Sequence, residues 1–91
     1  MNILVIGFGN MGCRHAQAFL NDTSYTVSVI EPNDKVFNSN LLRIGGTSEN
    51  INRITFSECK KGFFDFAVIA TSAEIRLLLF KEVLNIGIKN I

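Results

Sequence analysis

The chain has 91 residues, which is enough for one small domain and too few for two. Its hydrophobic residues (47%) and charged residues (19%) are in a globular proportion, and a net charge of +1 gives no reason to expect nucleic acid or an anionic membrane as a partner. No stretch approaches the roughly 20 apolar residues of a membrane span. Cys13 and Cys59 lie far apart without a histidine at metal-ligand spacing, so we expect a reduced cytoplasmic protein with no disulfide and no metal.

The first third of the sequence predicts a strand, a helix and a second strand. Residues 2–6, NILVI, form an apolar run that ends at glycine, as in a strand buried on both faces. Residues 10–20 have the spacing of an amphipathic helix. The face expected to be apolar contains Met11, His15, Ala16, Ala18, Phe19 and Leu20. Residues 25–31, YTVSVIE, are rich in β-branched side chains and stop before Pro32, which predicts the second strand.

The middle of the chain has a weaker pattern. Residues 34–43 predict a helix that ends at the glycine pair 45–46. The inward face expected of this helix is Val36, Phe37, Leu41 and Leu42. Residues 53–56 predict a short strand, and residues 57–63 predict a helical turn closed at Gly62.

The last third again has a clear pattern. Residues 64–71, FDFAVIAT, predict a central strand, and residues 73–85 predict a helix with Gly87 beyond its end. The face expected to be apolar contains Ile75, Leu78, Leu79, Val83 and Ile86. Residues 88–91 begin another predicted strand. Strands that alternate with helices indicate a Rossmann-type three-layer α/β fold, with a parallel β-sheet flanked by helices and expected to lack its last strands.

A glycine-rich turn between the first strand and the first helix carries the clearest functional signal. It contains G-x-G-x-x-G as Gly7-Phe8-Gly9-Asn10-Met11-Gly12. Glycines alone would fit any sharp corner, but this motif follows a strand and opens a helix, as a dinucleotide-binding turn must. Gly7 would permit the tight turn, Gly9 would let the backbone approach a pyrophosphate, and Gly12 would let the helix pack closely. The phosphates would lie at the free N–H groups of the helix N-terminus.

An acidic residue stands where the ribose of such a nucleotide needs one. Glu31 ends the second predicted strand, 19 residues after Gly12, against an expected spacing of about 20. Its carboxylate would accept hydrogen bonds from the ribose hydroxyls and repel a 2′-phosphate, which favours NAD over NADP. Pro32 and Asn33 follow, with no arginine to hold a phosphate, while Lys35 is close enough to keep NADP as the less favoured alternative.

Several segments together resemble the N-terminal NAD(P)-binding domain of the Gfo/Idh/MocA family, the glucose–fructose oxidoreductases and inositol dehydrogenases. The resembling segments are GFGNMGCRHAQAF at 7–19, Glu31, DFAVIATSAEIR at 65–76 and NIGIKNI at 85–91, together with strand 2–6. The most specific features are His15, three residues after the third glycine, and Ala70-Thr71 at a strand end. The resemblance fades between residues 35 and 60.

This resemblance implies an oxidoreductase that transfers hydride between nicotinamide and a sugar, polyol or related substrate. The residues that it implies on the pyrophosphate and nicotinamide side of the site are Phe8, Gly9, Asn10 and Met11. It also implies that Thr71 and Ser72 lie beside the dinucleotide. The family usually has a proline and then a histidine after that threonine, and here Ser72 and Arg76 replace them.

The sequence stops at Ile91, where the family's next strand would carry a Glu-Lys-Pro motif whose lysine helps catalysis. We therefore expect residues 1–91 to be a dinucleotide-binding domain fragment without a substrate domain, which binds the cofactor and is inactive alone. No catalytic residue is assigned. His15, on the first helix, is expected to pack or to cap rather than to act as a base.

Two other functions stay open on the sequence. A nucleotide-sensing regulatory domain, like those that gate potassium transport, would also have a glycine turn, an acid after the second strand and an IAT-like strand end. The residues GCRH, and the lack of Asp-Glu after Thr71, favour the oxidoreductase. The other is an assembly domain without ligand binding, because a sheet cut short has an unpaired edge through which the chain could self-associate.

Overall fold

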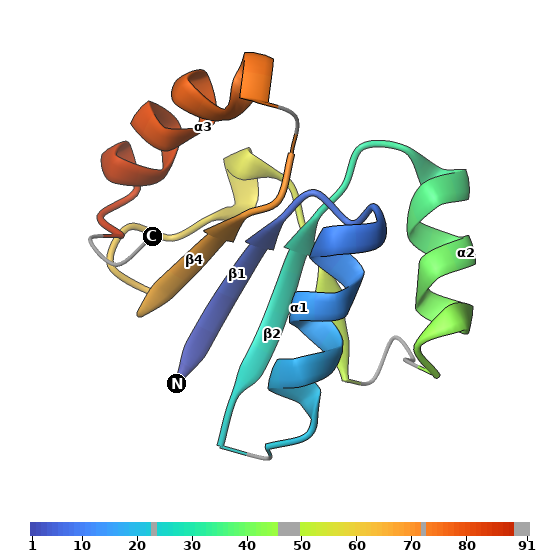
Figure 1. The fold of residues 1–91 in the computed structure, drawn as a ribbon. Coiled ribbons are helices and arrows are strands. Elements are labelled where there is room, and N and C mark those ends of the chain that lie inside the picture. The colour runs from blue at the N-terminus through green and yellow to red at the C-terminus, as the bar shows by residue number, and fades with distance from the viewer. Residues whose placement is uncertain (23, 46–49, 72, 89–91) are drawn as a thin grey trace.

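The fold is a parallel sheet with helices on both faces, in a computed structural model that describes residues 1–22, 24–45, 50–71 and 73–88 (Figure 1). The elements in chain order are β1 (Asn2–Ile6), α1 (Asn10–Leu20), β2 (Thr26–Ile30), α2 (Asp34–Arg43), β3 (Ile51–Arg53), the 3-10 helix η1 (Phe56–Glu58), β4 (Phe66–Ile69) and α3 (Ala73–Asn85). The strand order is β3-β2-β1-β4, and all three pairs are parallel. Helices α1 and α2 lie on one side of the sheet and α3 on the other, which confirms the predicted three-layer α/β arrangement (Figure 1).

The carboxyl ends of three strands meet at one edge of the sheet. Ile6 of β1 is in register with Ile30 of β2 and with Ile69 of β4. The segments that follow these three residues are the glycine turn, Glu31 and the Ala70-Thr71 pair. In open parallel sheets, ligands bind outside this edge.

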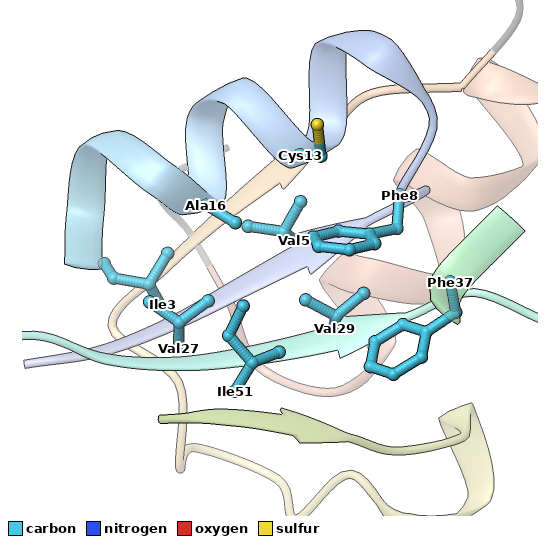
Figure 2. Close-up of a cluster of buried hydrophobic side chains, with 9 residues drawn as sticks. All are labelled: Ile3, Val5, Phe8, Cys13, Ala16, Val27, Val29, Phe37 and Ile51. Carbon is cyan, nitrogen blue, oxygen red and sulfur yellow. The ribbon is translucent and has the colours of Figure 1, made fainter. Parts of the chain in front are cut away.

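Alternate side chains of the strands form two separate hydrophobic cores, one on each face. The cluster on the α1 and α2 side contains Ile3, Val5, Phe8, Cys13, Ala16, Val27, Val29, Phe37 and Ile51 (Figure 2). The cluster on the α3 side contains Leu4, Ile6, Ile30, Phe64, Ala67, Val83 and Ile88. Because β1 contributes to both, its continuous apolar sequence is explained by burial on both faces.

Most of the predicted elements occur close to the predicted positions. The bounds of β1, α1, α2 and α3 are those expected, and β2 is one residue shorter at each end. The weakly patterned middle is less well predicted, because β3 ends at Arg53 where the predicted strand began. The element β4 is an edge strand of the sheet that the described residues form, where the sequence predicted a central one. Residues 89–91, predicted to begin a further strand, lie outside the described residues.

The buried face of α1 differs from the predicted face. Met11 is 61% exposed, and His15 and Ala18 are exposed as well, whereas the buried residues of the helix are Gly12, Cys13 and Ala16. The helix packs on the sheet through its small residues, because a close helix–strand approach leaves no space for larger ones. His15, which was expected to pack or to cap, is exposed on this helix.

The outward side of α3 is also more apolar than predicted. Val83 is buried and Leu79 packs against the core, but Ile75 and Leu78, expected on the inward face, are 46% and 65% exposed. In α2, Phe37 is buried as expected, while Leu42 is exposed.

Within the described residues, no helix is long and apolar enough to cross a membrane. Self-association through an unpaired edge, at β3 or β4, stays a prediction.

The close approach of α1 to the glycine turn gives a test of stability. A Cβ atom at Gly12 would overlap the carbonyl oxygen of Gly7, whereas a Cβ at Gly9 would meet no atom within 4 Å. We expect Gly12→Ala to lower the free energy of unfolding by about 2 kcal/mol or more, as overpacked interiors do. The matched variant Gly9→Ala should lower it by about 1 kcal/mol at most, through the helix N-cap preference. Urea unfolding measures both, and equal losses would contradict this account of the packing.

Candidate functional site

The first glycine of the turn is required by the backbone and by its neighbours. Gly7 has φ +93°, a conformation that side chains other than glycine rarely adopt. Its N–H donates to the carbonyl oxygen of Ile30 at 2.8 Å. A Cβ at Gly7 would lie 2.8 Å from the carbonyl oxygen of Ala70 and 2.9 Å from Cγ2 of Thr71. The turn is therefore held tightly between the ends of β2 and β4.

The second glycine, Gly9, is required neither by its backbone conformation nor by its neighbours. Gly9 has φ −73°, which any residue can adopt, and open space surrounds the position of its missing Cβ. It is the N-cap of α1, and among the described residues no side chain caps this end; its first turn contains no acidic residue either. The N–H groups of the first turn are thus left for a ligand, and the helix dipole favours a negative charge there.

The other turn residues differ in which of their atoms a ligand could reach. The Phe8 side chain is fully buried, with its ring centroid 5.2 Å from that of Phe37, so a ligand can reach Phe8 only through its backbone (Figure 2). The side chains of Asn10 and Met11 are exposed at the start of α1. All of the turn residues expected to contact a cofactor therefore lie at one end of α1, with the Phe8 ring directed into the core.

Helix α2 braces this turn by two contacts that the sequence did not indicate. The Asn40 side-chain amide donates to the Phe8 carbonyl oxygen at 2.7 Å, and Nη1 of Arg43 donates to Oδ1 of Asn10 at 2.7 Å. Both donors lie in α2, more than thirty residues along the chain from their acceptors. No local pattern in the sequence could reveal them, because they depend on how two helices pack side by side.

Glu31 lies beside the glycine turn, as the sequence predicted. Its Oε1 accepts a hydrogen bond from the Phe8 N–H at 2.9 Å, and its Oε2 accepts one from the Asn33 N–H at 3.0 Å. These two bonds fix the carboxylate at the junction of the turn and the end of β2. An acidic side chain in this place can accept hydrogen bonds from a sugar hydroxyl that approaches the same edge.

An arginine that the sequence reasoning missed lies next to Glu31. Arg53, the last residue of β3, donates from Nε and Nη2 to the Glu31 carbonyl oxygen at 3.0 and 2.6 Å. Its Nη1 is 2.7 Å from Oδ1 of Asp34, and its guanidinium carbon lies 4.9 Å from the centroid of the Phe37 ring. The sequence pattern predicts a phosphate-binding cation just after Glu31. Arg53 comes instead from the neighbouring strand, where it is paired with Val29.

A cavity of about 760 Å³ opens at the carboxyl edge of the sheet, next to the turn. Its lining residues are Ile6, Gly7, Ile30, Glu31, Pro32, Arg53, Ile54, Thr55, Phe56, Glu58, Thr71, Ile75 and Leu79. The volume is within the usual range of small-molecule sites, and apolar walls with a few polar groups are typical of them. The walls contributed by η1 and α3 were not predicted as part of the site.

Thr71 brings an unpaired polar atom to this cavity. Its Oγ1 is buried and has no hydrogen-bond partner among the described residues, while its carbonyl oxygen accepts from Nη2 of Arg76 at 3.1 Å. An unsatisfied buried hydroxyl has a cost that a bound ligand could remove. Ser72, the other predicted site residue in this segment, lies outside the described residues.

The two cysteines and the histidine do not line the cavity. Cys13 is buried under α1, with its Sγ 3.7 Å from the carbonyl oxygen of Asn10. Partial burial, and then the negative charge of Glu58, raise the pKa of the Cys59 thiol. Both thiols are free. His15 is exposed on α1 and does not line the cavity.

No protein-family model matches the chain, and no curated protein sequence matches it. Similar solved structures include scyllo-inositol dehydrogenase from Lactobacillus casei with bound NAD(H) and scyllo-inositol, with a TM-score of 0.71 and 15% identity over 99% of this chain and 26% of that one. The apo form of that enzyme gives a TM-score of 0.72 and 15% identity over 99% and 27% of the two chains.

A third similar structure is a mutant UDP-glucuronic acid 4-epimerase from Bacillus cereus in complex with UDP-4-deoxy-4-fluoro-glucuronic acid and NAD. It has a TM-score of 0.59 and 21% identity over 77% of this chain and 26% of that one. The chain thus spans about a quarter of the length of these structures. At such identities the likeness shows the fold: a Rossmann-like α/β domain.

The bond between Asn40 and the turn can be tested by stability. In Asn40→Ala the Phe8 carbonyl oxygen loses its donor, and we expect the free energy of unfolding to fall by about 1 kcal/mol relative to Asn38→Ala. Asn38 is an exposed residue of the same helix, so both variants share the gain in helix propensity and their difference isolates the bond. Urea unfolding gives the comparison, and equal stabilities would show that the Asn40 bond does not stabilise the turn.

Proposed function

We propose that the chain binds NAD at the glycine turn and the adjoining cavity, as the dinucleotide-binding part of an oxidoreductase. The parent enzyme would transfer hydride between nicotinamide and a sugar, polyol or related substrate. The observation that carries the proposal is Gly9. The fold itself leaves room for a side chain at this position, yet the residue is a glycine at an uncapped helix N-terminus, which suits a bound pyrophosphate.

The residues present fit the pyrophosphate, the adenosine ribose and the adenine of the cofactor. The pyrophosphate would lie against the N–H groups at the start of α1, and Glu31 would accept hydrogen bonds from the adenosine ribose. The cavity has the volume and apolar walls for the adenine, with Phe56 and Leu79 on its sides. Thr71 would use its unpaired hydroxyl beside the dinucleotide. The bound nicotinamide would supply the hydride acceptor or donor.

The charges around the cavity favour NAD over NADP. Glu31 and Glu58 are the acidic residues in its lining, and Arg53 is the basic one. The Arg53 charge is already paired with Asp34 at 2.7 Å. A 2′-phosphate would bring about two further negative charges to this place, whereas a 2′-hydroxyl would bring none.

The similar structures support the same class of ligand. The dehydrogenase holds NAD(H) with an inositol, and the epimerase holds NAD with a nucleotide sugar. The chain covers about a quarter of either protein, so the substrate class is inferred for the parent protein. Hydride transfer needs a substrate carbon held against the nicotinamide and a group that moves a proton. We therefore expect the 91-residue chain to bind the cofactor without turning over a substrate.

Calorimetric titration with NAD and NADP tests the proposal. We expect saturable binding of NAD, weaker binding of NADP, and a loss of at least about tenfold in NAD affinity in Gly9→Val, because the added side chain would block the phosphates. The matched control is Ala18→Val, which adds a similar bulk to an exposed position of the same helix. Circular dichroism checks that both variants are folded. Wild-type protein that binds neither dinucleotide, or Gly9→Val protein that binds NAD normally, would refute the proposal.

A further inference from the structure

We propose that the ion pair between Asp34 and Arg53 sets the preference between NAD and NADP, an inference that rests on the proposed function. Arg53 is the cation that a 2′-phosphate would pair with. Asp34 engages that cation and so keeps the site selective for NAD. The preference thus depends on a competition for one guanidinium, in addition to repulsion by Glu31.

The position of Arg53 relative to Glu31 supports this role. Two of its guanidinium nitrogens donate to the backbone carbonyl oxygen of Glu31. The cation is therefore bonded to the same residue whose carboxylate is assigned to the ribose. Arg53 lines the same cavity as Glu31 and Pro32, and it is the sole basic side chain in the described lining. Lys35, which the sequence suggested as a phosphate ligand, is exposed on α2 and does not line the cavity.

The guanidinium is held in place from three directions. The Glu31 carbonyl oxygen accepts from one edge, the Asp34 carboxylate pairs with Nη1, and the Phe37 ring lies 4.9 Å from the guanidinium carbon. A planar guanidinium fixed in this way is well suited to bind a phosphate through two nitrogens. A 2′-phosphate would have to share that cation with Asp34, because the Asp34 carboxylate already pairs with the same guanidinium at 2.7 Å.

Asp34 can be changed without disturbing the packing. It is the first residue of α2, and its side chain is 79% exposed. The helix keeps its cap without it, because Oδ1 of Asn33 accepts from the Val36 N–H at 3.0 Å. Replacing Asp34 by asparagine therefore removes the competing charge, while the Glu31 carbonyl oxygen and the Phe37 ring still hold the Arg53 guanidinium.

Binding titrations of NAD and NADP to five variants test the inference: Asp34→Asn, Arg53→Gln, the double variant of these two, Lys35→Gln and Asp22→Asn. We expect Asp34→Asn to raise the affinity for NADP relative to NAD by about tenfold, because the freed Arg53 can form charge-assisted bonds to the phosphate. The double variant should lose this gain. Lys35→Gln tests the other nearby cation, and Asp22→Asn makes the same change in net charge at the opposite edge of the sheet. In both controls the ratio of NADP affinity to NAD affinity should stay within about twofold of the wild-type ratio.

The outcomes separate the two proposals. Wild-type protein that binds NAD, with an unchanged ratio in Asp34→Asn, would overturn this inference and leave the proposed function standing. A gain that persists in the double variant would also overturn it, because the effect would then come from net charge and not from Arg53. Wild-type protein that binds neither dinucleotide would overturn the proposed function and this inference together.

Discussion

The site depends on one close approach, that of helix α1 to the carbonyl oxygen of Gly7. Only a residue without a Cβ fits at Gly12. A side chain at this position would push the helix away from the turn and the sheet. Its small neighbours Cys13 and Ala16 continue the contact along the helix (Figure 2). This packing sets the N-terminus of α1 at the carboxyl edge of β1, where the ends of β2 and β4 also lie (Figure 1). The uncapped N-terminus of the helix and the cavity therefore belong to one arrangement.

The parts of the fold that the sequence could predict are those with a strong local pattern. Strand β1 is a continuous apolar run between a polar start and a glycine, and α3 is a long apolar segment followed by Gly87, with φ +86°. The strand β3 has only three residues, of which two are exposed, so it has almost no pattern of its own. Its position comes from pairing with β2, which is a tertiary interaction.

The faces of the helices were harder to predict than their bounds, for a physical reason. Hydrophobicity suggested that Met11 and His15 of α1 would face inward, but a helix that approaches this closely selects for small size. In α3 nearly every turn contains apolar residues, and a helix with that composition does not indicate which side is buried. In both helices the buried side is set by packing against the sheet, which is a tertiary interaction.

The residues of the candidate site also differ in whether the sequence could predict them. Glu31 could be found because its distance from the glycine motif is fixed by one helix and one strand. Arg53 and Asn40 could not, since each reaches the site from an element whose position depends on packing. Arg53 also changes the interpretation of the local charge, because Glu31 is no longer an isolated acid but a neighbour of a paired cation.

The three glycines of the turn differ in what would happen to them if selection for a ligand ceased. Substitutions at Gly7 and Gly12 would be removed at once, because the chain would fold poorly with any side chain there. A side chain at Gly9 would meet no atom of the fold, so a substitution there would cost only the N-cap preference of the helix. The same three positions in a related sequence would therefore separate two demands, because a side chain at the second position leaves the packing of the turn intact and changes only the space outside it.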